Sequence, residues 1–144
     1  MSRKLGNLGE QVFSFKMKEI GFKVDNVSNN PDYWSKDIDF IITSPSGNTR
    51  TFEVKYDNRL HQTGNIYLEL TNIHSQGGRG WFDFCQADFL AYGDADSRRF
   101  YIIPLTKLRE YINQLPQRAA SCGKDSTGLL VRIDDIHDII TATI

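Results

Sequence analysis

The stretch DIDFIITSPSGNTRTFEVK, residues 37–55, decides the fold. Polar and apolar residues alternate on both sides of the turn sequence SPSGN, residues 44–48, which is the pattern of a β-hairpin with one buried face. If residues 45–47 form a three-residue loop, Gly47 takes the position that requires a positive φ, and Ser44 pairs with Asn48.

That pairing sets the register of the whole hairpin. Counting outward places Asp39 opposite Glu53 and Asp37 opposite Lys55. Because side chains alternate along a strand, these four side chains share one face. The opposite face takes the apolar residues: Phe40, Ile42, Phe52 and Val54. The sequence therefore predicts a charged face and an apolar face on the same two strands.

The charged face suggests a metal site. Directly opposed carboxylates such as Asp39 and Glu53 destabilise a sheet unless a cation neutralises them. Mg²⁺ prefers oxygen ligands, with Mn²⁺ as a substitute, and the carbonyl of Val54 could supply another oxygen. Lys55 could orient an attacking water or neutralise charge on a phosphate, and the sequence favours neither role. The alternative is an exposed hairpin in which Asp37 and Lys55 form an ion pair worth at most about 1 kcal/mol.

Two other aspartates precede Glu53 and compete for the same role. We prefer Asp39 to Asp37 because Asp39 pairs with Glu53 and leads directly into the apolar run. Asp32 follows Pro31 in the turn-rich segment 28–37, where no strand register directs it toward the site. We therefore exclude Asp32.

The rest of the chain predicts an α/β fold. Residues 4–20 have the pattern of a helix that packs on a sheet, and Gly21 is suited to end it. Its expected apolar face comprises Leu5, Leu8, Val12, Phe13, Phe15, Met17 and Ile20. Further elements are expected as strands over 65–70, 87–93, 99–105 and 128–133 and as helices from Thr106 through Leu115 and from near Asp134. We expect one domain over residues 1–144, with a mixed β-sheet and helices packed on it.

Composition narrows the class of protein. Of the 144 residues, 40% are hydrophobic and 24% charged, which are proportions of a folded domain. The net charge of -1 argues against a broadly cationic DNA-coating protein. Positive charge gathers near the start, at Arg3, Lys4, Lys16, Lys18 and Lys23. This cluster is either a solvated helix face or a DNA-facing patch that includes Lys4.

The cysteines and the apolar runs indicate the cellular setting. Cys85 and Cys122 are far apart and form no CxxC motif, so neither a zinc knuckle nor a disulfide framework is expected. No signal peptide is visible, and no run approaches the roughly 18 apolar residues of a membrane span. We expect a protein of a reducing cytoplasm that does not enter a membrane.

The order of motifs resembles a known family. Residues 6–10 read GNLGE, residues 21–24 GFKV, residues 38–42 IDFII and residues 52–55 FEVK, with a glycine turn between the last two. This order is similar to that of the PD-(D/E)XK nuclease superfamily, which includes Holliday-junction resolvases and many restriction enzymes. The match covers residues 6–55, and later pieces such as TGNI, residues 63–66, are similar to small phage-encoded or mobile-element members.

The resemblance implies both a fold and an activity. It implies an αβββαβ restriction-endonuclease-like core and a Mg²⁺-dependent endonuclease that hydrolyses DNA, with selectivity for branched DNA such as Holliday junctions as one form. Asp39, Glu53 and Lys55 would be the motif, and Glu10 would complete the metal site. The position of Glu10 on the helix alone predicts a solvated glutamate. The expected setting is the cytoplasm of a bacterial or phage-infected cell.

Several further residues have two interpretations. Glu69 is either another metal ligand or a surface charge. The glycine-rich stretch 74–81 carries His74, Arg79 and Trp81, which could contact phosphates or stack on bases, or form a mobile loop anchored by the tryptophan. The expected partner is DNA, and a homodimer is plausible because cutting two strands usually takes two sites. The rival is a non-catalytic nucleic-acid-binding or assembly module that retains the fold.

Overall fold

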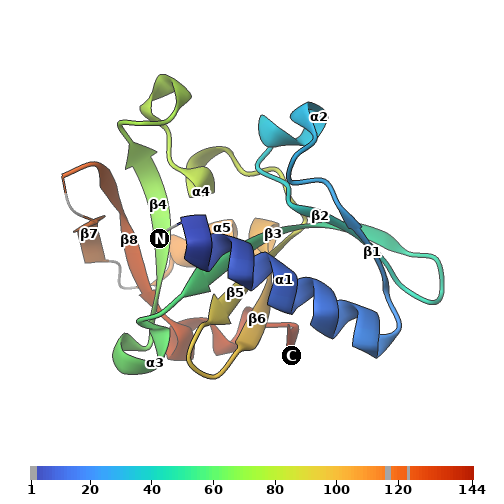
Figure 1. Ribbon diagram of the computed structural model, residues 1–144. Helices are drawn as coiled ribbons and strands as arrows, with labels where there is room; N and C mark the ends of the chain where they lie inside the picture. Colours follow the sequence, from blue (N-terminus) through green and yellow to red (C-terminus); the bar gives the residue numbers. More distant parts are fainter. Residues whose placement is uncertain (1–2, 116–117, 123) are drawn as a thin grey trace.

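The computed structural model describes residues 3–115, 118–122 and 124–144, and two β-sheets organise them (Figure 1). The larger sheet has the strand order β1-β2-β3-β5-β6-β9, and the smaller has the order β4-β8-β7. The strands of the larger sheet are β1 (Lys23–Asn26), β2 (Phe40–Thr43), β3 (Thr49–Asp57), β5 (Phe89–Asp94), β6 (Arg99–Pro104) and β9 (Ala142–Thr143). Those of the smaller are β4 (Asn65–Asn72), β7 (Arg118–Cys122) and β8 (Ser126–Arg132).

One long helix and several short ones accompany the sheets. The α-helices are α1 (Arg3–Ile20), α2 (Pro31–Trp34), α3 (Leu60–Thr63), α4 (Trp81–Phe84) and α5 (Leu105–Ile112). Two 3₁₀ helices, η1 (Gln76–Gly78) and η2 (Ile133–Ile139), complete the set. None of the helices in the described part of the chain is long and apolar enough to cross a membrane.

Helix α1 packs on the larger sheet through a narrow stripe. Its buried residues, Gly9, Phe13 and Met17, recur every four positions, which places them on one side of the helix. The ring of Phe13 lies 5.3 Å from Phe40. Gly9 permits the close approach, because a Cβ at this position would lie 2.4 Å from Cβ of Tyr56. This contact holds α1 against β3.

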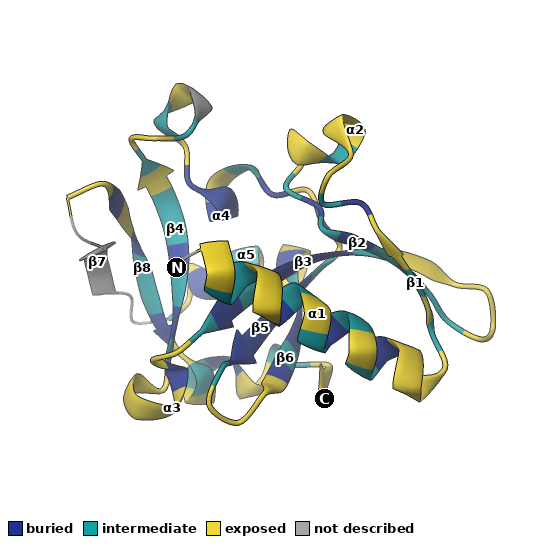
Figure 2. Ribbon diagram, viewed as in Figure 1, coloured by how far each residue is buried: buried dark blue, intermediate teal, exposed yellow. Residues whose placement is uncertain are grey.

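The ends and outer face of α1 were only partly predicted. Gly21 ends the helix as expected, with a φ of 101°, and its N–H donates to the Lys18 carbonyl at 3.0 Å. The predicted apolar face was too wide, because Leu8, Phe15 and Ile20 are 49%, 62% and 52% exposed. Figure 2 shows these exposed turns alternating with the buried stripe along the helix. A single helix on a flat sheet can bury only the side that faces the sheet.

The hairpin register is confirmed. Strand pairs run from Thr43 with Thr49 to Phe40 with Phe52, and the Ser44 N–H donates to the Asn48 carbonyl at 2.8 Å. Gly47 has the positive φ that the turn requires, 93°. The predicted apolar face is buried under α1: Phe40, Ile42, Phe52 and Val54.

The prediction that Asp37 begins the strand was wrong. Strand β2 begins at Phe40, and Asp37 has a φ of 54°, in the left-handed region that no strand residue adopts. The N–H of Asp39 donates to the carbonyl of Phe52 at 2.9 Å, so the regular ladder ends at the Phe40 pair. Asp37 and Asp39 therefore lie on a turn at the entrance to β2.

The prediction of one sheet was also wrong. Strand β3 pairs in parallel with β5, and the connection between them contains α3, β4 and α4. Strand β4 pairs with β8 instead of joining the larger sheet. The connection thus forms a second sheet beside β3, which no local pattern in residues 65–70 could reveal.

Three helical segments differ from their predicted form. The segment 28–37, expected as a loop, contains the single turn α2, where Oδ1 of Asn30 accepts the Asp32 N–H at 3.0 Å. Helix α5 begins at Leu105 with Pro104 as its N-cap, instead of being capped by Thr106. The helix expected near Asp134 is the 3₁₀ helix η2.

Candidate active site

Glu53 lies at the centre of the charged face of β3. The residue is 2% exposed, and its Oε1 is 3.1 Å from Nζ of Lys55. Its other oxygen, Oε2, is buried without a hydrogen-bond partner. Lys55 is 22% exposed, so this ion pair lies at the boundary between the core and solvent.

The turn before β2 brings two more carboxylates to Glu53. Oδ2 of Asp39 accepts a hydrogen bond from the Val54 N–H at 2.9 Å, and Oδ2 of Asp37 is buried without a partner. The N–H and carbonyl of a strand residue point toward the same neighbour, so the Val54 carbonyl also faces this turn. The structure thus brings Asp37, Asp39 and Glu53 together, although only Asp39 had been preferred as the partner of Glu53.

Burial perturbs all three carboxyl groups, and repulsion between carboxylates adds to its effect at Asp37 and Glu53. Burial raises the pKa of Glu53 well above its ordinary value; Lys55 opposes this, and Asp37 and Asp39 add to it. Burial raises the pKa of Asp37 to about 6 against the lowering effect of Lys55. Burial likewise raises the pKa of Asp39, although the hydrogen bond from the Val54 N–H and the charge of Lys55 lower it. The folded chain holds these groups where their charged forms are disfavoured.

Lys55 responds in the opposite sense to its surroundings. Burial alone would lower the pKa of Lys55, but Glu53, Asp37 and Asp39 together raise it above the ordinary value. The ammonium group therefore stays charged at neutral pH. Its Nζ also lies 4.9 Å from the centroid of the Trp81 ring, a cation–π contact that helps to fix its position.

Glu10 on α1 and Glu69 on β4 lie near this group. Burial raises the pKa of Glu10 on α1, and the nearby charge of Asp39 raises it further, whereas Ser28 and Lys55 lower it. Oε2 of Glu69 accepts a hydrogen bond from the Ser126 hydroxyl at 2.8 Å, and Glu69 contributes to the raised pKa of Asp37. Both glutamates lie near the site, and Glu69 is anchored within the smaller sheet.

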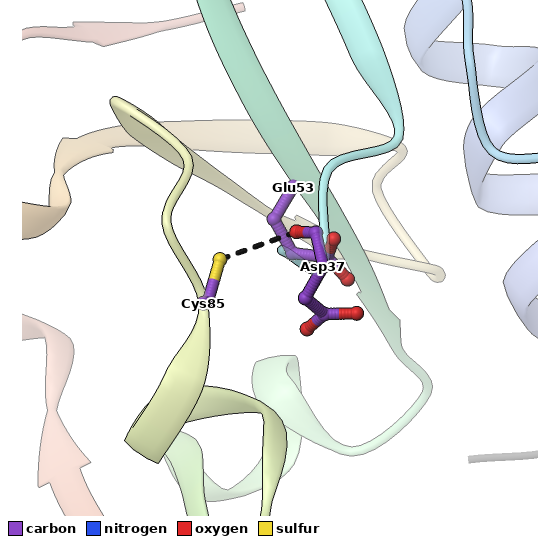
Figure 3. A group of neighbouring side chains, drawn as sticks. All are labelled: Asp37, Glu53 and Cys85. Carbon is purple, nitrogen blue, oxygen red and sulfur yellow. Dashed lines mark hydrogen bonds between the residues drawn. The ribbon is translucent and has the colours of Figure 1, made fainter. Parts of the chain in front are cut away.

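Cys85 was not anticipated at this site. One oxygen each of Asp37 and Glu53 and the sulfur of Cys85 lie within 4.8 Å of one another (Figure 3). The thiol donates to the backbone carbonyl of Asp37 at 3.2 Å, and burial, followed by the nearby Glu53, raises its pKa to about 12. A thiol that stays protonated does not act as a thiolate ligand. The available donors are therefore oxygens, which suit a hard divalent cation.

The residues proposed for DNA contact are spread more widely. Trp81 and Arg79 line a cleft of about 780 Å³ that also reaches Lys55. Nε of Arg79 is paired with Asp83 at 2.6 Å. Lys4 is exposed in the first turn of α1, and Nε2 of His74 is 2.9 Å from Oδ2 of Asp125. Neither Lys4 nor His74 lines the cleft.

Three residues outside the carboxylate site complete the comparison with the sequence: Asp32, Asp88 and Cys122. Asp32 is exposed on α2, as expected for a residue outside the site. Asp88, directly before β5, accepts hydrogen bonds from the backbone N–H and the hydroxyl of Thr51 at 2.9 and 3.2 Å. The side chain of Cys122 lies outside the described residues, so a free thiol is established for Cys85 alone.

Known structures provide an independent comparison. No protein-family model matches the chain, and no curated protein does. The structure is similar to that of the bacterial homing endonuclease I-Ssp6803I, with a TM-score of 0.56 and 18% identity, covering 93% of this chain and 81% of the endonuclease. The two chains share a fold. At this identity the likeness concerns the fold, and any shared activity is a separate question.

Proposed function

We propose that this chain is a DNA endonuclease of the PD-(D/E)XK type that uses Mg²⁺ to hydrolyse phosphodiester bonds. One observation supports this most strongly: Oδ2 of Asp37 and Oε2 of Glu53 are buried without hydrogen-bond partners beside the ammonium of Lys55. Buried carboxylate oxygens without partners are costly, and a bound cation is a physical reason to keep them. The likeness to a homing endonuclease agrees with this proposal.

The oxygens on the charged face fit a magnesium ion. Asp39, Glu53 and the carbonyl of Val54 would hold it, since Asp39 on the turn before β2 accepts the Val54 N–H and lies close enough to Glu53 to raise its pKa. Asp37 and Glu10 are the next candidates. Glu69 comes last because Ser126 and Asn72 already bond to its Oε2. A bound Mg²⁺, or Mn²⁺ in its place, would supply an activated water and charge stabilisation at the phosphate.

Lys55 would act through its charge. Its raised pKa keeps the amine protonated, so it does not accept a proton from water at neutral pH. The ammonium can donate hydrogen bonds to an attacking water or to a phosphate oxygen, and it offsets the charge that develops there. Its contacts with Glu53 and Trp81 hold it in place for this role.

The order of elements is compatible with the proposed superfamily core. Helix α1, the antiparallel strands β1, β2 and β3, and the parallel strand β5 follow one another along the chain. In place of one long crossover helix, the connection contains the strand β4 and the short helix α4. We propose that this chain is a variant of the αβββαβ arrangement with an elaborated crossover.

DNA would lie across the open side of this site. We assign backbone contacts to Lys4 on α1 and to His74 and Arg79 in the segment before α4, with Trp81 beside Lys55. A homodimer would place two such sites on the two strands of a duplex, and a branched substrate such as a Holliday junction would suit paired sites.

A cleavage screen tests the proposal. Supercoiled, linear and branched DNA are incubated with the chain in Mg²⁺, in Mn²⁺ and in chelator. We expect cleavage only with metal, and its loss in Glu53→Gln and Asp39→Asn. The matched control is Asp25→Asn, which changes an exposed aspartate on β1 and retains activity. DNA binding without cleavage under every condition would instead indicate a non-catalytic module with this fold.

A further inference from the structure

A cleft extends from Lys55 away from the carboxylates. One wall is the second half of β3 with the turn that follows it, and the other comprises β4 and residues 75–84. Lys55 belongs both to the carboxylate site and to the cleft, because it pairs with Glu53 and also lines the cleft. Whatever occupies the cleft therefore lies directly beside the proposed reaction centre.

The dimensions of the cleft suit one nucleotide. Its volume of about 780 Å³ equals that of a sphere about 11 Å across, which is narrower than the major groove of B-DNA alone, about 12 Å. A duplex cannot enter such a space, whereas small ligands occupy pockets of this size. Five aromatic residues line it, of which Tyr67 and Phe84 are partly exposed: Tyr56, Tyr67, Trp81, Phe84 and Tyr92. Aromatic surfaces of this kind stack on nucleobases of any sequence.

The polar lining contains a buried amide oxygen without a hydrogen-bond partner. Oδ1 of Asn65 is buried and has no hydrogen-bond partner, and Asn65 lines the cleft. A carboxamide carries a donor and an acceptor side by side, which match the edge of a nucleobase. The hydroxyl of Tyr92 is already engaged, since it donates to Asp57 at 2.7 Å and accepts the Tyr67 N–H at 3.1 Å. Asn65 is therefore the residue that would bond to the base, and the hydroxyl of Tyr92 is already occupied.

Among the described residues that line the cleft, Arg59 is the cation without a carboxylate partner. Arg59 lines the cleft and is exposed, and within the described ranges its guanidinium has no ion pair. Arg79 is held by the carboxylate and carbonyl of Asp83. The carboxylate of Asp57 is also occupied, by Tyr92 and by the backbone N–H of Arg59. Arg59 therefore offers the charge that would meet a phosphate in the cleft.

We infer that this cleft is a subsite for one unpaired nucleotide of the DNA substrate. The base lies among the aromatic walls with Asn65 at its edge, and the phosphate lies near Arg59. The inference rests on the proposed function to the extent that the DNA runs across Lys55. It makes the preferred substrate a DNA with a nucleotide that is unpaired, or easily extruded from the stack, beside the cleavage point.

The test measures binding in chelator, where cleavage does not occur. Fluorescence anisotropy compares a fully paired duplex with the same duplex carrying one extra unpaired nucleotide. We expect the second to bind at least about tenfold more tightly, a modest effect for base stacking on aromatic side chains. Arg59→Ala and Asn65→Leu should each lower this preference by about tenfold. Arg50→Ala, at the other end of β3 and also exposed, is the matched control and should retain it.

A second measurement needs no variant. An unpaired 2-aminopurine at the extra position should lose fluorescence when the chain binds, because the base stacks on aromatic rings. Equal affinity for the two duplexes, an unchanged 2-aminopurine signal, or a preference that survives in both Arg59→Ala and Asn65→Leu would overturn the inference.

The two proposals can fail separately. Metal-dependent cleavage of fully paired DNA, without any preference for the extra nucleotide, would reject the subsite and leave the nuclease in place. A clear preference in chelator from a chain that cleaves no DNA with metal would reject the nuclease and leave a binding site for an unpaired nucleotide.

Discussion

Replacing Asp37 with asparagine removes one buried carboxylate at almost constant size. Asparagine tolerates the left-handed backbone at this position, where φ is 54°. The hydrogen bond from Cys85 is also retained, because it goes to the backbone carbonyl of Asp37. The substitution therefore isolates the effect of the charge.

The size and sign of the effect follow from the pKa of Asp37. Burial raises it from 3.8 to about 6, so the folded chain binds this proton more tightly than the unfolded chain. The free energy of unfolding therefore falls as pH rises between these two values, and the loss is complete above the folded pKa. A rise in pKa from 3.8 to about 6 corresponds to about 3 kcal/mol. Asp37→Asn should raise the free energy of unfolding by about 3 kcal/mol at about pH 7.5 and by about half of that near pH 5.

Urea unfolding in chelator, followed by circular dichroism, measures this gain at several pH values. Asp25→Asn, an exposed substitution on β1, controls for the general loss of one negative charge. Asp37 is a candidate metal ligand, so the variant should bind Mg²⁺ more weakly than the wild type. Added Mg²⁺ should therefore stabilise the wild-type chain more than the variant, because a ligand stabilises the folded state that binds it. A variant that is equally or less stable than the wild type at every pH in chelator would refute the picture of a strained carboxylate at Asp37.

Three further predictions concern packing, chemistry and the thiol. Gly9→Ala should lower the free energy of unfolding by about 1 to 3 kcal/mol, because the new Cβ would lie 2.4 Å from Cβ of Tyr56. Gly6→Ala, which meets nothing within 4 Å, should instead be neutral or stabilising by up to about 1 kcal/mol in the same urea titration. Lys55→Met should abolish cleavage. Its affinity for DNA, measured by gel shift in chelator, should stay within about tenfold of the wild-type value, because the variant loses one charge among several contacts. Native Cys85 should resist iodoacetamide at pH 8 and react only after unfolding, as peptide mass spectrometry would report, because burial raises the pKa of its thiol to about 12.

The hairpin was predictable because its determinants are local. The alternation of apolar residues and Gly47 at the turn define the register, and the strand pairs from Thr43 with Thr49 to Phe40 with Phe52 confirm it. The same register brought Glu53 and Asp39 to one side. Helix α1 was predictable for the same reason, since Gly21 and the spacing of its apolar residues are local signals.

The position of Asp37 was not predictable from the strand pattern. Counting along a regular ladder placed it opposite Lys55, but the chain leaves the ladder before Phe40 through a left-handed residue. Aspartate tolerates that conformation more readily than most residues do, and this is the only signal the sequence offered. The result is that Asp37 approaches Glu53 from a turn.

The remainder of the site depends on contacts between distant segments. Cys85 bonds to a carbonyl 48 residues earlier in the chain, and Ser126 bonds to Glu69 across two strands of the smaller sheet. Such contacts follow from how the crossover folds beside β3, and periodicity in one segment contains no information about them. The cleft beyond Lys55 arises in the same way, between two separate sheets.

The most direct test of the central claim is the position of a bound metal. Crystals of the chain grown or soaked with Mn²⁺ are measured at a wavelength where manganese scatters anomalously. We predict one strong anomalous peak bounded by the carboxylates of Asp39 and Glu53, and its disappearance in Glu53→Gln. Manganese bound elsewhere, or a fully ordered Asp39 and Glu53 with no peak between them at saturating Mn²⁺, would contradict the account.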